Sequence, residues 1–258
     1  MTNEHYVDEP NLSVAWARAV QIASATGRKE AGPLVVSITG FDASGEFSED
    51  ATIRTEVDAL LSSEGMQSVE TVSNTIFPTS LWNPLLPRAR LFERYQRIVP
   101  RLKRATHKNR RGLYFERMIS GGPPGRENQI DFVLSTYARG HVRRSVLQVA
   151  IFDPRQDHSA AALLGFPCLQ HVTFAPIDGG LCVNAFYATQ FMIERAYGNY
   201  VGICRLGRFI AHQLNLPLVQ ATCFVGIAEC EVVKRKLVNL RSAVDRILCA
   251  ETRTGVET

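Results

Sequence analysis

Residues 171–187 constrain the fold most, because they carry the pattern of a β-hairpin. Two segments rich in β-branched and aromatic residues, 171–175 and 181–187, flank the sequence Asp178-Gly179-Gly180. A turn of this composition suits the backbone conformations with positive φ that tight hairpins require. The segment therefore predicts two antiparallel strands joined by a short turn.

Apolar periodicity divides the rest of the chain into helices and strands. Apolar positions spaced by three and four residues predict helices over residues 12–25, 53–61, 90–103, 128–137, 203–214 and 229–248. Asn11 or Ser13 would cap the first of these helices. Short apolar runs rich in β-formers predict strands over residues 33–38, 145–152 and 218–225. Residues 67–77 fit either a helix or a strand. Helices mixed with hairpin-linked strands favour an α+β domain over a doubly wound one.

Length and composition indicate one soluble domain that spans residues 1–258. A chain of 258 residues is long enough for one sizeable core, and no segment has the composition of a hinge. No apolar run approaches the roughly 18 residues that a membrane span requires. The polar, acidic N-terminus lacks the pattern of a secretory signal. We therefore expect a cytoplasmic protein without a membrane partner.

The six cysteines all lie in the C-terminal half, without a CxxC pair and without a histidine at zinc spacing. Such spacing predicts neither a disulfide framework nor a metal site. Most of these cysteines are expected to be buried as small apolar residues.

The predicted helix over residues 90–103 has a basic outer face, formed by Arg90, Arg94, Arg97 and Arg101. Aromatic residues do not interleave with these charges, as they do in many nucleic-acid sites. The pattern therefore favours a solvated face over a binding surface for a nucleic-acid polymer.

Cys168 follows Pro167 in a predicted loop and permits two interpretations. A lone cysteine is most often a buried core residue. Alternatively, positive charge from the pair Arg143-Arg144 stabilises its thiolate and makes it a nucleophile at neutral pH. Spacing in the sequence leaves both interpretations open.

A set of motifs in a fixed order resembles thymidylate synthase and the related pyrimidine hydroxymethylases. The motifs are Arg143-Arg144, Pro167-Cys168, the hairpin turn Asp178-Gly179-Gly180-Leu181, and Asn199 followed by an apolar helix. The resemblance is closest over residues 128–231. It implies an α+β fold with a large mixed sheet that is packed by helices and used as a homodimer interface. It also implies that the arginine pair of one subunit reaches the substrate phosphate held by the other.

The resemblance implies covalent chemistry on a pyrimidine nucleotide. The thiolate of Cys168 would add to C6 of the ring, which turns C5 into a carbon nucleophile. C5 would then take a one-carbon unit from 5,10-methylenetetrahydrofolate, as a methyl or hydroxymethyl group. A role in secondary metabolism or in the synthesis of modified nucleotides would suit such a chain.

The resemblance also assigns roles to individual residues. Cys168 would be the nucleophile, Tyr114 an active-site tyrosine and Glu70 the acid that relays protons. The phosphate ligands would be Arg28, Arg143 and Arg144. Asn199 would hydrogen-bond the pyrimidine edge, and an amide there favours uracil over cytosine.

Three segments depart from the family pattern. Leu169 stands where the family has a histidine. Residues 187–191 replace a Gln-Arg-Ser-x-Asp segment, so that Phe191 takes the place of a carboxylate that orients folate. Glu229-Cys230-Glu231 replaces a His-x-Tyr segment that holds the sugar. Glu229 and Glu231 would bind hydroxyls or an amine of a different substrate, or would occupy the exposed first turn of the last helix.

These departures leave three hypotheses. The first is one-carbon transfer to C5 of a pyrimidine nucleotide or related ring. The second keeps the addition of Cys168 to an electron-poor ring but dispenses with folate. The third is a non-catalytic homodimeric binding protein of the same fold.

Overall fold

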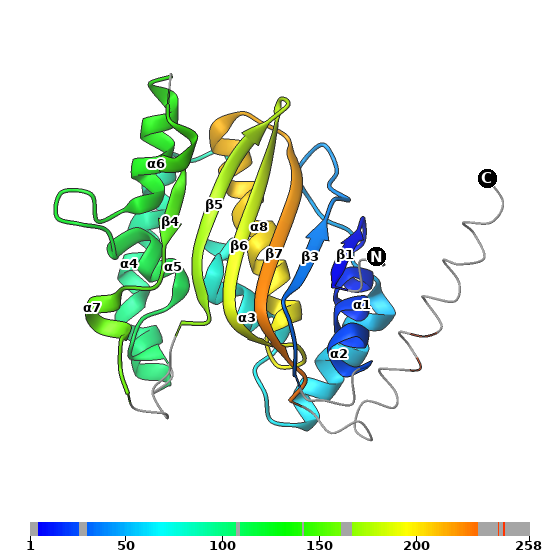
Figure 1. Ribbon diagram of the computed structural model, residues 1–258. Coiled ribbons are helices and arrows are strands. Elements are labelled where there is room, and N and C mark those ends of the chain that lie inside the picture. The colour runs from blue at the N-terminus through cyan, green and yellow to red at the C-terminus, as the bar shows by residue number, and fades with distance from the viewer. Residues whose placement is uncertain are drawn as a thin grey trace.

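The computed structural model describes residues 5–25, 30–106, 109–140, 142–160 and 167–231, together with Ser242 and Asp245. Arg28 lies outside the described residues, and so does most of the helix predicted over residues 229–248. The described part is a mixed α/β structure in which helices pack on a large sheet (Figure 1).

The sheet has seven strands in the described part of the chain. These are β1 (Tyr6–Glu9), β2 (Glu30–Ala31), β3 (Leu34–Ile38), β4 (Gln148–Ala150), β5 (Leu169–Ile177), β6 (Gly180–Phe191) and β7 (Leu218–Glu229). Their order is β1-β3-β7-β6-β5-β4, and β2 also pairs with β7. The pairs β1–β3 and β6–β7 are parallel and the others antiparallel, so the prediction of a large mixed sheet packed by helices is confirmed.

The predicted hairpin is formed by β5 and β6. Asp178 and Gly179 both have positive φ, 49° and 80°. Two consecutive residues of this kind match the right-handed twist of the flanking strands, which explains the Asp-Gly sequence at the turn.

Eight α-helices are described. They are α1 (Leu12–Ala25), α2 (Ala51–Ser63), α3 (Val69–Ile76), α4 (Arg88–Ala105), α5 (Tyr114–Ser120), α6 (Gln129–Ala138), α7 (Pro154–Asp157) and α8 (Ala196–Leu214). Short 3-10 turns form η1 (Thr79–Leu81) and η3 (Arg144–Val146). The predicted start of α1 is confirmed, because Oδ1 of Asn11 accepts a hydrogen bond from the Ser13 amide at 2.9 Å.

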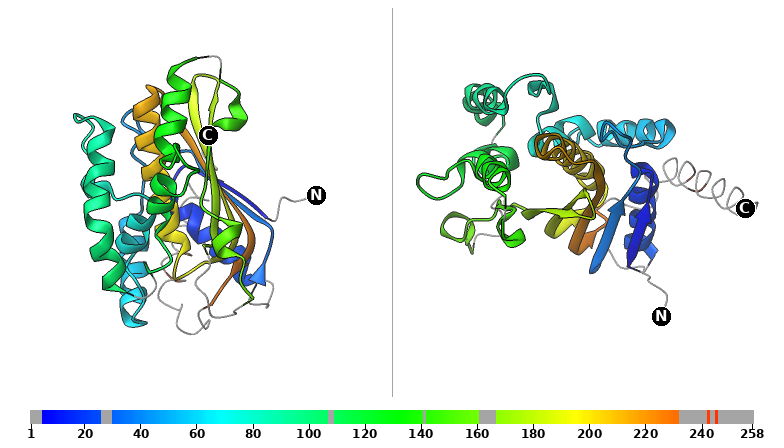
Figure 2. Two further views of the ribbon diagram at one scale, coloured as in Figure 1. Left: turned by 90° about the vertical axis from the view of Figure 1, so that its left-hand side faces the viewer. Right: turned by 90° about the horizontal axis from the view of Figure 1, so that it is seen from above.

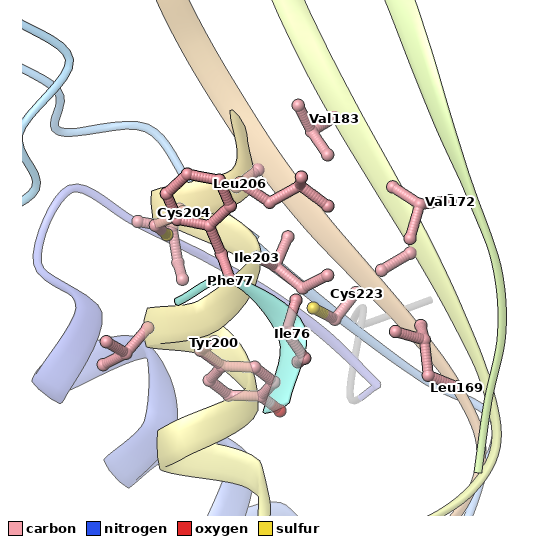
Figure 3. Packing of buried hydrophobic residues seen from close by; sticks show 14 of the residues in the cluster. Ile76, Phe77, Leu169, Val172, Val183, Tyr200, Ile203, Cys204, Leu206 and Cys223 are labelled. Atoms are coloured by element: carbon pink, nitrogen blue, oxygen red, sulfur yellow. The ribbon is translucent and has the colours of Figure 1, made fainter. Parts of the chain in front are cut away.

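Helix α8 connects the parallel strands β6 and β7 and lies at the centre of the core. Its residues Tyr200, Ile203 and Leu206 are buried above the sheet, as Figure 3 shows. Helix α3 packs closely on α8 at Gly198, where an added Cβ would lie 2.6 Å from the Cβ of Val72. The glycine therefore sets how near the two helices approach.

The helices gather on one face of the sheet, and no helix of the described residues covers the central strands on the other face (Figure 2). A row of rings crosses this open face. His171 stacks on Phe186 with ring centroids 5.6 Å apart, and Phe186 stacks on Phe224 at 5.1 Å. Phe224 is 37% exposed. The face is thus partly apolar and accessible in the single chain.

Several predicted boundaries were wrong. The strand predicted from residue 145 begins as η3, and the loop before Cys168 contains α7. Helix α8 starts at Ala196 rather than at residue 203, because its first turns are buried on all sides and carry no amphipathic period. Strand β7 continues to Glu229, which pairs with both Glu30 and Phe191. Residues 67–77, which fit either structure, contain α3.

Candidate functional site

Four chain segments meet at one end of the central strands of the sheet. Strand β5 begins where the antiparallel β6 ends, and β6 ends beside the end of its parallel neighbour β7. Cys168 immediately precedes β5, and its carbonyl accepts a hydrogen bond from the Ala188 amide at 3.1 Å. Helix α8 starts a few residues after Phe191, the last residue of β6. The start of β5, which Cys168 immediately precedes, and the first turn of α8 therefore lie at the same end of the sheet, the lower end in Figure 1.

Tyr114 lies beside Cys168. It is the first residue of α5, and its phenol oxygen faces the backbone amides of Leu169 and Cys168. Burial raises the pKa of Tyr114, and the charge of the Cys168 thiolate would raise it further, while the nearby N–H groups act in the opposite direction. The phenol is thus held in its neutral form, in which it can donate a proton in a hydrogen bond.

The environment of Cys168 raises the pKa of its thiol. Burial is the largest cause, and the negative charge of Glu229 adds to it. The guanidinium of Arg195 opposes both effects without cancelling them. At neutral pH the thiol therefore dominates in the free protein, and a ligand or base must help to form the thiolate.

Arg143 and Arg144 are not at the Cys168 site of their own chain, which corrects the idea that they stabilise its thiolate there. Both are exposed and precede β4. Gln148 of β4 pairs with Thr173, five residues along β5 from Cys168, a separation of about 16 Å along an extended strand. The chain before β4 continues away from Cys168, since the carbonyl of Leu147 accepts a hydrogen bond from the Phe174 amide at 2.8 Å. Its role across a subunit interface stays a prediction.

Arg195 is the cation that sequence reasoning missed. It lies in the turn between β6 and α8, and its side chain is 25% exposed. Its Nη1 donates to Oε1 of Gln67 at 2.5 Å, and its Nη2 lies 2.8 Å from Oε1 of Glu194. Residues 187–191 lack the arginine that the family resemblance expects, and this lack was the available signal for a replacement nearby.

The predicted ring-binding residue Asn199 is buried in the first turn of α8, with 3% of its surface exposed. Tyr187 and Gln190 of β6 are also buried. Oη of Tyr187 and Nε2 of Gln190 have no hydrogen-bond partner among the described residues. Oε1 of Gln190 accepts a hydrogen bond from Oη of Tyr200 at 3.2 Å. Sequence reasoning assigned no role to either residue.

Glu229 and Glu231 are partly buried, so the interpretation as an exposed first turn of a helix is wrong for them. Glu229 pairs with Phe191 in the sheet, and its charge acts on Cys168. Burial raises the pKa of Glu231, which accepts hydrogen bonds from the amides of Ile193, at 3.1 Å, and of Glu194. Glu231 thus holds the turn that carries Arg195.

Glu70, the predicted proton relay, is engaged away from Cys168. Its carboxylate accepts hydrogen bonds from Nη1 of Arg205 at 2.9 Å and from Nδ2 of Asn74 at 3.1 Å. Burial alone would raise the pKa of Glu70, but the hydrogen bond and charge of Arg205 lower it overall. Glu229, rather than Glu70, is the carboxylate whose charge acts on the thiol.

The described groups that act on Cys168 or lie beside it are a phenol, a cation and a carboxylate, those of Tyr114, Arg195 and Glu229. Within the described residues, no group of three or more potential ligands could hold a metal ion. No helix of that part of the chain is long and apolar enough to cross a membrane.

No protein-family model matches the chain, and no curated protein shows significant sequence similarity to it.

Proposed function

We propose that the protein is an enzyme of the thymidylate synthase type, in which Cys168 attacks C6 of a pyrimidine nucleotide and C5 takes up a one-carbon unit. The observation that carries this proposal is the meeting of Tyr114 with Cys168. The family resemblance assigns both residues to the active site, although they lie far apart in the sequence. Arg195 and Asn199 add a cation and an amide at the same edge of the sheet.

The proposed addition joins the sulfur of Cys168 to C6 and moves the C5–C6 π electrons toward C5 and the neighbouring carbonyl. C5 then bonds to the carbon electrophile and loses its proton to a base. Expulsion of the thiolate restores the C5–C6 double bond. A one-carbon unit at the oxidation level of formaldehyde would then give a hydroxymethyl group by taking up water, whereas a methyl group would also require a hydride donor. Because the thiol is protonated in the free protein, binding of the ring must precede or accompany its loss of the proton.

The residues near Phe191 do not fit the family's folate site. Phe191 is the last residue of β6 and is partly buried, and its side chain offers no carboxylate to a pterin. We therefore derive no step through methylenetetrahydrofolate, and its use stays a prediction. The same observation favours the second candidate function, an addition to the ring followed by proton exchange at C5 without folate.

Release of tritium from the C5-labelled monophosphates of uridine, deoxyuridine and cytidine tests both functions. Release without folate supports the addition of Cys168 to the ring, and formation of a new C5 substituent with methylenetetrahydrofolate supports full transfer. Cys168→Ser is the control and should bind nucleotide without releasing tritium. If the wild type releases no tritium under either condition, the covalent chemistry is wrong and the non-catalytic binding protein becomes the better account.

We further propose that the open sheet face binds a second copy of the chain. The ring row formed by His171, Phe186 and Phe224 supplies apolar surface for such a contact. The distance of Arg143 and Arg144 from Cys168 within one chain supports it too, since a partner would be needed to bring them to the phosphate. Phe224→Asp should give a monomer in sedimentation where the wild type is a dimer.

Mixing two inactive variants tests the exchange of arginines. A dimer of one Cys168→Ser subunit and one Arg144→Ala subunit has one site with both a cysteine and an intact arginine pair. Activity should therefore return on mixing. A wild type that sediments as a monomer while active would refute the shared site.

A further inference from the structure

We propose that Tyr187 and Gln190 are specificity residues that read the carbonyl edge of the pyrimidine ring beside Cys168. The inference rests on the proposed function for the identity of the ring. In this assignment, Nε2 of Gln190 donates a hydrogen bond to a ring carbonyl. Oη of Tyr187 forms a hydrogen bond with a neighbouring carbonyl or ring nitrogen.

The first observation is that both side chains are buried with unsatisfied polar atoms. Tyr187 is 0% exposed and Gln190 is 1% exposed. Neither Oη of Tyr187 nor Nε2 of Gln190 has a partner in the described part of the chain. A buried polar atom without a hydrogen bond destabilises the folded state, and folded proteins leave few of them. Tyr187 pairs with the residue after the nucleophile, and Gln190 lies three residues further along the same strand. Two such atoms on one strand therefore point to a ligand.

The second observation concerns the orientation of the Gln190 amide. Its Oε1 accepts the hydrogen bond from Tyr200 on α8, so that its Nε2 is the atom left over. An amide N–H₂ donates and does not accept. The missing partner of Gln190 is accordingly an acceptor such as a carbonyl oxygen, which every pyrimidine base of a nucleotide carries.

The third observation places these atoms beside the nucleophile. Tyr187 pairs with Leu169 in the sheet, and the next residue, Ala188, donates its amide hydrogen to the Cys168 carbonyl. Burial raises the pKa of the Tyr187 phenol, and Cys223, Tyr114, Tyr200 and Cys168 are close enough to add to this shift. A ring whose C6 lies at the sulfur would thus present its polar atoms to the end of β6.

The same strand segment departs from the family pattern, where residues 187–191 replace Gln-Arg-Ser-x-Asp. The new side chains are two groups that hydrogen-bond without carrying charge. They suit a neutral ring edge rather than a phosphate, which leaves the phosphate to Arg195 or to the arginine pair of a second subunit.

Isothermal titration of the full chain with the monophosphates of uridine and deoxyuridine tests the inference. Tyr187→Phe and Gln190→Met each remove the hydrogen-bonding atom and keep the volume nearly constant. Each should weaken nucleotide binding about tenfold, the scale of one lost hydrogen bond to a buried group. Tyr187→Phe should not lower the melting temperature, because Oη of Tyr187 has no partner among the described residues of the free protein. Gln190→Met also removes the Oε1 that accepts the hydrogen bond of Tyr200, so it should lower the melting temperature, and its binding is measured well below that temperature.

Tyr95→Phe is the matched control. Oη of Tyr95 is also buried without a partner in the described part of the chain, but its ring packs against Phe115, 4.8 Å away, beneath α4. This variant should match Tyr187→Phe in melting temperature and bind nucleotide as the wild type does. Binding within twofold of wild type for both Tyr187→Phe and Gln190→Met would overturn the inference, and so would a wild type that binds neither nucleotide.

The tritium assay separates this inference from the proposed function. A wild type that binds deoxyuridine monophosphate through Tyr187 and Gln190 but releases no C5 tritium would support the binding site and refute the chemistry. A wild type that releases tritium, with variants of unchanged affinity, would refute the binding site alone.

Discussion

Replacing Asp157 by asparagine should destabilise the protein strongly, because Asp157 belongs to a buried ion pair. Nη1 of Arg117 lies 2.5 Å from Oδ2 of Asp157, and Nη2 lies 2.9 Å from Oδ1. The two side chains are 9% and 2% exposed. The same guanidinium also donates to the carbonyls of Ile151 and Arg111, at 2.9 Å each. An asparagine at this position would leave the cation buried without its counter-charge and would turn an N–H₂ group toward it.

Breaking a buried pair by removing one charge costs about 3–5 kcal/mol. A chain of 258 residues has an unfolding entropy of about 0.5 kcal/mol per kelvin, at roughly 2.1 cal/mol/K per residue. The melting temperature should therefore fall by roughly 6–9 °C. The substitution should also disturb the position of Tyr114. Arg117 lies one turn after Tyr114 on α5, and its ion pair with Asp157 fixes α5 against α7.

Thermal unfolding followed by circular dichroism measures the effect. Asp131→Asn is the matched control, since its ion pair with Arg88 at 2.7 Å is much more exposed, 34% and 47%, and should contribute less than about 1 kcal/mol. The double replacement Arg117→Met with Asp157→Leu should cost less than Asp157→Asn alone, because it removes both charges together. Equal losses for the Asp157 and Asp131 variants would refute the reasoning.

The pH dependence gives an independent check. Burial alone would raise the pKa of Asp157, but hydrogen bonds from Arg117 and the Asp153 amide, with the charge of Arg117, lower it overall. A carboxyl with a lowered pKa in the folded state stabilises the protein above its unfolded pKa, about 3.9 for aspartate. That stability is lost as the pH falls through the lower folded pKa. The free energies of unfolding of the wild type and the asparagine variant should therefore differ most near neutral pH and become similar only below about pH 4.

Three further predictions concern the site and the core. Arg195→Met should slow the alkylation of Cys168 by iodoacetamide at pH 8 and Glu229→Gln should speed it, because the two charges shift the thiol pKa in opposite directions; equal rates would contradict the assigned environment. Gly198→Ala should lower the free energy of unfolding by about 1–3 kcal/mol in urea titrations, since the added Cβ would collide with α3. Arg144→Ala should weaken the binding of a nucleoside monophosphate by about 1.5–3 kcal/mol relative to the nucleoside, and an unchanged ratio would exclude a phosphate at that residue.

Local chemistry made part of the fold predictable. The Asp-Gly turn requires positive φ, and the Asn11 side chain accepts a hydrogen bond from an amide at the start of α1, so both features can be inferred without the tertiary structure. The start of α8 could not, because a helix that is buried all round has no amphipathic period. The end of β7 was not predicted, because an acidic residue such as Glu229 is typical of the start of a helix. Its strand conformation depends on pairing with Glu30 and Phe191, which are distant in the sequence.

The site was predictable where function depends on residue type and unpredictable where it depends on the surroundings. Cys168 and Tyr114 carry reactive groups that a motif can identify. The charges that set the thiol pKa are different, because they come from wherever the chain brings a charged side chain close. Glu231 illustrates this, since its carboxylate binds the amides of residues 193 and 194 and thereby holds the turn with Arg195. The substrate contact predicted for Glu231 stays a prediction, and its hydrogen bonds to this turn suggest a second role, which is to position Arg195. Glu231→Gln should accordingly change the reactivity of Cys168 in the same direction as Arg195→Met, and an alkylation rate that stays at the wild-type value would show that the turn does not depend on this carboxylate.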